Sequence, residues 1–218
     1  DGGSSVGENG GRPDTRRAVM TDVKLEREAL KLFERMLDMI ASSPGTIDGV
    51  RFFGLLSSGT PELLKPDTGG IVWTDPAAAP DFTLPFAILE ALTKRRLRPF
   101  IALGFFPPAI SPSPIAPPQD FQRWQLLIAQ FLAGLAGDAR FGPESIQTWR
   151  FEVWNEPNEG RFWSGSFEQY LDLYRATSEA VRETGLTIRL GGPAMAYKPE
   201  SEAEDGPETM RRFLEFLR

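Results

Sequence analysis

Residues 149–158 read Trp149-Arg150-Phe151-Glu152-Val153-Trp154-Asn155-Glu156-Pro157-Asn158. Phe151, Val153 and Trp154 favour a strand, and Pro157 stops a strand directly after Glu156. The segment therefore predicts a buried β-strand with an Asn–Glu pair at its carboxyl end. In an α/β barrel, catalytic groups lie at this end of a strand, before a loop and a helix.

Glu156 is the first candidate for a catalytic side chain. It lies beside the amide of Asn155 and between aromatic residues, and an apolar setting favours the protonated carboxylic acid that a general acid needs. Taken alone, Glu156 is better explained as a glutamate that caps the next loop. The strand, loop and helix around it together favour the catalytic interpretation.

The residue types that are missing narrow the chemistry. The 218 residues contain no histidine and no cysteine. A Ser-His-Asp triad, a Cys-His pair and nearly every zinc site are therefore excluded, and no metal or cofactor is expected. Acid/base chemistry then falls to Asp, Glu, Lys or Tyr, and glycoside hydrolysis is the commonest chemistry that uses a carboxylate pair.

Charge and hydropathy exclude other classes of protein. The net charge is −6, and no basic stripe alternates with aromatic residues, so no nucleic-acid partner is expected. No apolar run approaches the ~20 residues of a membrane span. The lack of cysteine leaves the compartment open.

The order of elements predicts an α/β fold. We expect residues 1–20 to be a flexible N-terminal arm and residues 21–218 to form one domain, in which a helix precedes four strand–helix units. The expected strands span residues 48–56, 98–104, 147–154 and 187–190. A (β/α)₈ TIM barrel needs eight strands, so the sequence predicts an incomplete barrel of about four β/α units.

Four segments also resemble a known family. Residues 151–158 are similar to the acid/base strand of family 39 glycoside hydrolases, the β-xylosidase and α-L-iduronidase group of clan A. Residues 50–54, 98–107 and 189–194 resemble neighbouring strands of that barrel, in the family's order. The resemblance covers the chain from about Ile47 onward, as the second to fifth strands.

The resemblance implies a retaining glycosidase in which Glu156 is the general acid/base and Asn155 binds a sugar hydroxyl. Arg51 either binds sugar and orients a carboxylate or forms a structural ion pair. Trp163 and, with less support, Phe106 either stack on a sugar or pack in the core. Family members often carry a histidine near Phe53, so a polar sugar contact is replaced here.

The family's nucleophilic glutamate lies on a later strand, and none is found in this chain. Two alternatives therefore stay open: a non-catalytic carbohydrate-binding or truncated barrel, and another clan A polysaccharide endo-hydrolase. The expected partner is a carbohydrate. The open strand edges and an uncovered, apolar barrel interior also predict self-association or a complementing chain.

Overall fold

The computed structural model describes residues 30–43, 47–57, 72–196 and 206–218. The arm expected over residues 1–20 lies outside these ranges. Within them, four strands form one parallel sheet: β1 (Gly49–Phe53), β2 (Arg98–Leu103), β3 (Arg150–Val153) and β4 (Arg189–Gly191). The order across the sheet follows the order along the chain, as expected for consecutive right-handed β/α units.

Helices alternate with the strands. Residues 30–42 are helical ahead of β1, and the later helices are α2 (Thr83–Thr93), α3 (Gln122–Gly137), α4 (Gly142–Ile146), α5 (Phe167–Thr184) and α6 (Gly206–Phe216). The short α4 was not predicted, although Pro143 in its first turn is a helix-start signal. No helix in the described ranges has the length and hydropathy needed to cross a membrane.

The spacing of Ser166 and Gln169 in the sequence predicts a capping box at a helix start, and the start of α5 confirms it. The hydroxyl of Ser166 accepts the backbone N–H of Gln169, and the side chain of Gln169 accepts the backbone N–H of Ser166. This capping box satisfies two amide groups that a helix start otherwise leaves unpaired. It fixes where the helix begins after the loop that follows β3.

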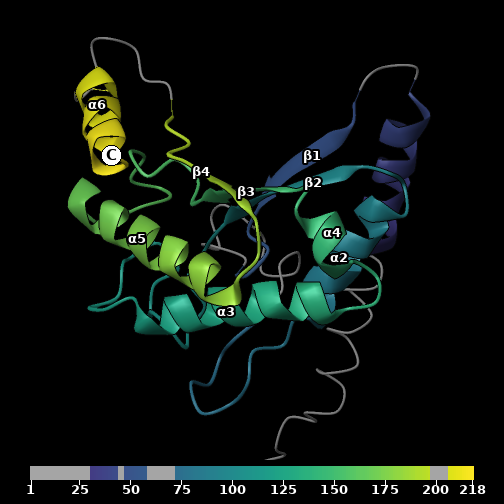
Figure 1. The fold of residues 1–218 in the computed structure, drawn as a ribbon, viewed down its shortest axis with the longest axis horizontal. Coiled ribbons are helices and arrows are strands. Elements are labelled where there is room, and N and C mark those ends of the chain that lie inside the picture. The colour runs from purple at the N-terminus through teal and green to yellow at the C-terminus, as the bar shows by residue number, and fades with distance from the viewer. Residues whose placement is uncertain (1–29, 44–46, 58–71, 197–205) are drawn as a thin grey trace, which may run out of the picture.

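One face of the sheet is covered by helices (Figure 1). Ile101, Leu103, Phe151 and Val153 point to this face and are at most 1% exposed. Beneath them α3 packs against α5, where the Trp124 indole donates a buried hydrogen bond to the Thr177 hydroxyl at 2.8 Å. These four residues therefore form part of the apolar core between the sheet and the helices.

The other face of the sheet differs from the apolar interior that the sequence predicted. Its side chains form two rows in register across the four strands: Arg51, Phe100, Arg150 and Arg189, then Phe53, Ala102, Glu152 and Gly191. Since side chains alternate along a strand, this face carries the other set of strand residues, which mixes three arginines and a glutamate with two phenylalanines, an alanine and a glycine. Strands β1 and β4 are the two edges of the described sheet.

Candidate active site

Strand β3 ends in a strained turn that carries both predicted catalytic residues. The strand stops at Val153, and Trp154 and Glu156 both have left-handed backbone, with φ of 69° and 46°. A non-glycine residue in this region is uncommon, costs ~1–3 kcal/mol, and is concentrated at functional sites. The alternation of side chains along the strand is broken at Trp154. The even spacing of Glu152 and Glu156 therefore does not place their side chains on the same face of the sheet.

Buried hydrogen bonds hold this turn. The Trp154 indole N–H donates to the carbonyl of Phe162 at 2.8 Å, and the Tyr170 hydroxyl donates to the carbonyl of Val153 at 3.1 Å. Both bonds are buried, so water does not compete with them. Tyr170 was expected only as a core residue of α5, and its hydroxyl in fact fixes the end of β3.

Asn158 adds a second attachment, which no pattern in the sequence predicts. Its amide nitrogen donates to the carbonyl of Ala196 at 3.0 Å, and its oxygen accepts the backbone N–H of Ala196 at 2.8 Å. This reciprocal pair ties the loop after β3 to the segment after β4. The end of β3 and the loop that carries Glu156 are thus restrained by α5 and by the segment after β4.

Arg51 lies at the centre of a polar network on the open face. Its guanidinium donates to Oε2 of Glu152 at 2.6 and 2.9 Å and to Oδ1 of Asn155 at 3.1 Å. The side chain of Glu152 is 13% exposed, and that of Arg51 is 35% exposed. Arg51 therefore forms the ion pair that was one of the two roles foreseen for it, and it also contacts the side chain of Asn155, whereas its binding of sugar stays a prediction.

The bond from Arg51 decides what Asn155 offers. Because Oδ1 of Asn155 accepts from Arg51, its amide nitrogen Nδ2 is left to donate elsewhere. Nδ2 makes no hydrogen bond to a described residue. Every fully buried side-chain nitrogen or oxygen among the described residues does have a hydrogen-bond partner, so Nδ2 is not fully buried. The structure thus presents a fixed donor next to Glu156.

Glu156 itself is partly buried, and no hydrogen bond or ion pair to its carboxylate is present within the described ranges. Its backbone carbonyl accepts from the N–H of Glu159 at 3.0 Å, which fixes the turn but leaves the side chain unengaged. The structure thus brings Arg51 of β1 into contact with Asn155, and Glu156 follows Asn155 directly at the carboxyl end of β3. Such a carboxylate can exchange a proton with a bound molecule.

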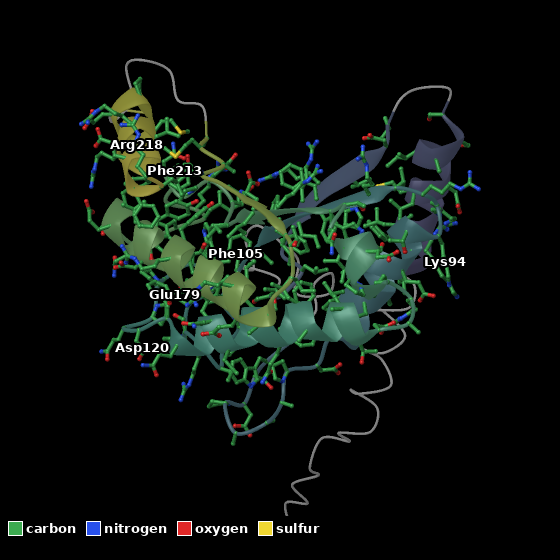
Figure 2. The ribbon with its side chains drawn as sticks, in the orientation of Figure 1. Lys94, Phe105, Asp120, Glu179, Phe213 and Arg218 are labelled. Carbon is green, nitrogen blue, oxygen red and sulfur yellow. The ribbon has the colours of Figure 1, made fainter. Side chains whose placement is uncertain are left out.

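Phe106 and Trp163 belong to a buried aromatic cluster around Trp154 and are not part of the polar network of Arg51. Phe106 is 1% exposed and packs against Trp154 with ring centroids 4.6 Å apart, and Trp163 is 3% exposed with centroids 5.2 Å from Trp154. The indole of Trp163 donates to the carbonyl of Ser166 at 3.0 Å. Burial of both rings favours the core alternative over sugar stacking. Figure 2 shows Phe105 of the same cluster near the centre of the molecule.

The acidic run near the C-terminus is typical of a solvated face, and the structure describes one of its members, Glu208. Glu208 and Glu215 on α6 both pair with Arg211. These ion pairs hold the pKa of Glu208 below its usual value, chiefly through the hydrogen bond from Arg211. The other glutamates of this run, at positions 200, 202 and 204, lie outside the described residues.

We expect Tyr170→Phe to test the anchoring of β3. The variant loses the hydrogen bond to Val153, and we expect the free energy of unfolding at neutral pH to fall by about 1–2 kcal/mol. Tyr174→Phe is the matched control, because Tyr174 is also a buried tyrosine on the same helix, yet its hydroxyl makes no hydrogen bond to any described residue. Urea denaturation of the three proteins measures the difference.

The same pair of variants predicts a pH dependence. Burial, followed by the charges of Tyr174 and Glu152, raises the pKa of Tyr170 above the ordinary value of 10.0. The folded state therefore favours neutral Tyr170, which contributes stability below about pH 10 that is lost as pH rises toward the folded pKa. The deficit of Tyr170→Phe should shrink between neutral pH and about pH 11. A deficit that stays constant would contradict this assignment.

Fold and site together define the class of protein. Four consecutive parallel β/α units carry an Asn–Glu pair at the carboxyl end of the third strand, as in part of a (β/α)₈ barrel with its site on the carboxyl face. Residues 23–216 match the glycosyl hydrolases family 39. The chain belongs to this family.

Individual relatives agree with the match. The chain is 31% identical over 157 residues to a β-xylosidase of Caldicellulosiruptor saccharolyticus, covering 67% of this chain and 30% of the relative. It is 34% identical over 125 residues to a β-xylosidase of Geobacillus stearothermophilus, covering 53% and 24%. A β-xylosidase structure from Caulobacter crescentus superposes with a TM-score of 0.55 at 32% identity, covering 66% and 33%. The chain thus spans less than a third of the curated relatives' length, and the fold is an incomplete TIM-barrel type.

Proposed function

We propose that this chain supplies the acid/base part of a retaining glycoside hydrolase. Glu156 donates a proton to the leaving oxygen and later takes one from the attacking water. Membership of family 39 supports the reaction class, and the position of Glu156 at the carboxyl end of β3 supports its role. The observation that carries the proposal is the fixed amide donor of Asn155 beside an unengaged carboxylate.

Asn155 has a defined task in this proposal. Its Nδ2 donates to a sugar hydroxyl next to the anomeric carbon, and Arg51 keeps the amide in the orientation that makes this bond available. Such a bond can strengthen as the oxocarbenium-like transition state forms. Glu152 holds the guanidinium of Arg51 in place. Glu152 is therefore a positioning residue that acts through Arg51 and does not itself contact the sugar.

The nucleophile is the part that the described residues do not supply. Retaining enzymes place their two carboxyl groups about 5–5.5 Å apart. Glu152 is engaged by Arg51, and the described glutamates of α6 pair with Arg211 on a solvated helix. We therefore propose that the second carboxylate comes from chain that completes the barrel. The partner is either a complementing segment or a second copy that pairs with the edges β1 and β4.

Two other functions remain as alternatives. A barrel part that binds carbohydrate without cleaving it would need Asn155 but not the proton of Glu156. A clan A endo-hydrolase would use the same two residues on a polymer rather than on a terminal sugar. Sugar binding is common to all three functions, and proton transfer through Glu156 separates the first alternative from the other two.

Sugar binding gives the first test. We expect methyl β-D-xylopyranoside to perturb the NMR signals of the chain at millimolar concentration, and Asn155→Ala to weaken this binding about fivefold, since a hydrogen bond to sugar is worth about 1 kcal/mol. Asn158→Ala is a control that disturbs the loop without removing the sugar donor. Binding that is equal in wild type and Asn155→Ala would contradict the proposed site.

A further inference from the structure

Phe53 is the most exposed aromatic residue among those that the structure describes. Its side chain is 37% exposed, and no other described aromatic residue is more than partly exposed. It is the last residue of β1, at the same end of the sheet as Asn155 and Glu156. An exposed ring at the functional end of a strand differs from an apolar residue scattered on a helix surface.

Neighbouring rings hold Phe53 in place. Its centroid lies 6.1 Å from that of Phe105 and 5.8 Å from that of Phe162, with interplanar angles of 85° and 80°. These two supporting rings are themselves stacked at 5° and buried, at 1% and 8% exposure. Edge-to-face contacts of this kind are favourable and fix the plane of a ring. Little conformational entropy is then lost when a ligand covers it.

Phe53 also shares its face with the polar network. Arg51 precedes it by two residues, so alternation places both side chains on the open face of the sheet, where Arg51 contacts Asn155. In the sheet register, Ala102 of β2 lies between Phe53 of β1 and Glu152 of β3. The side chain of Ala102 is a single methyl group, so it fills little of the space between them. A fixed aromatic ring beside a few convergent polar groups is typical of a small-molecule site.

We propose that Phe53 is a specificity-determining residue that stacks on the C–H face of a neutral pyranoside. The proposal rests on the proposed function and narrows its substrate class. An apolar ring gives no hydrogen bond to a hydroxyl or carboxylate placed against it, so burial of such a group there is costly. Arg51 is already engaged by Glu152 and Asn155. The other arginines of this face, Arg150 and Arg189, lie two and three strands across the sheet from Phe53. The site therefore selects uncharged sugars over uronides.

The test compares two ligands that differ in one substituent. Methyl β-D-xylopyranoside and methyl β-D-glucuronopyranoside share the ring and its three hydroxyl groups, and the second adds a carboxylate at C5. We titrate each into the 218-residue chain and follow the ligand protons by NMR. Wild type should bind the xyloside more tightly and shift its C–H protons upfield, the signature of a ring that lies against them.

Variants assign the effect to Phe53. Phe53→Leu should weaken xyloside binding about three- to tenfold and abolish the upfield shift, and Phe53→Tyr should restore both. Phe216→Leu, which removes a partly exposed ring on α6, should change neither. Because Phe53 lies outside the buried core, these variants are expected to fold, and their amide spectra verify it.

The possible outcomes distinguish the role proposed for Phe53 from the proposed sugar site at Asn155 and Glu156, on which it rests. Xyloside binding that Asn155→Ala weakens but Phe53→Leu leaves unchanged would overturn the role of Phe53 and keep the site. Tighter binding of the glucuronide would overturn the selectivity. Binding that neither variant affects, or no binding of either sugar, would overturn both proposals.

Discussion

The purified 218-residue chain should release 4-nitrophenol from 4-nitrophenyl β-D-xylopyranoside several orders of magnitude more slowly than the Caulobacter crescentus β-xylosidase. Without the second carboxylate, no covalent intermediate forms, and loss of one member of a catalytic pair removes most of its rate enhancement. Proton donation by Glu156 does not compensate, because an activated aryl leaving group needs little of it. Stopped-flow absorbance measures both turnover and any initial burst.

Two observations control this experiment. Sedimentation velocity on the same sample shows whether the assayed species is a monomer or an assembly joined through β1 and β4, the edges that invite pairing. The sugar-binding titration shows whether the site is formed. A stoichiometric burst followed by turnover comparable to that of the Caulobacter enzyme would mean that the nucleophile lies within these residues.

In a completed barrel, Glu156→Gln should lower kcat/KM for xylobiose by about 10²–10⁴, the usual contribution of general acid catalysis. The completed protein joins this chain to the remaining strands of the Caulobacter relative, which is 32% identical over the shared part. For a dinitrophenyl xyloside, the glycosylation step should change far less, because that leaving group departs without a proton.

Glu159→Gln provides the matched control for that series. Glu159 is three residues further along the same loop, and its side chain pairs with Arg161 at 3.5 Å. Its removal should leave kcat/KM for both substrates within about twofold of the parent, as for a weak surface ion pair. If Glu156→Gln depressed both substrates equally at the glycosylation step, Glu156 would be a structural residue.

The sequence predicted the order of elements well, because the signals for it are local. Four strands, the helix that follows each, and the capping box at Ser166 and Gln169 all depend on residues a few positions apart. Boundaries were less accurate: β3 is shorter than predicted, because residues 147–149 form the turn after α4 and Trp154 adopts a left-handed backbone. Non-glycine residues rarely do this, and no local pattern announces it.

The site was predicted only in part, for a related reason. Asn155 and Glu156 were found because they adjoin a recognisable strand. The pairing of Arg51 with Glu152 links residues 101 positions apart across an intervening strand, so it depends on sheet register. The mixed polar and apolar character of the open face was missed for the same reason, since it appears only when the four strands are aligned.

Aromatic residues show the limit of assigning roles by position. Trp163 follows the acid/base strand in a loop and was a candidate for sugar stacking, yet its indole is buried and satisfied by Ser166. Phe53 lies inside a strand segment and drew attention only as a departure from relatives, yet it is the exposed ring. Burial depends on the packing of distant segments, which residue type does not reveal.

The central claim is that Glu156 is the acid/base residue of a retaining site, and azide rescue of Glu156→Ala in the completed barrel tests it most directly. Azide attacks a glycosyl-enzyme intermediate without needing a general base, so it bypasses the missing carboxylate. With a dinitrophenyl xyloside, we predict that azide restores turnover and that the product is β-xylosyl azide, with the configuration of the substrate retained. Turnover that azide does not change, or a product of inverted configuration, would contradict the account.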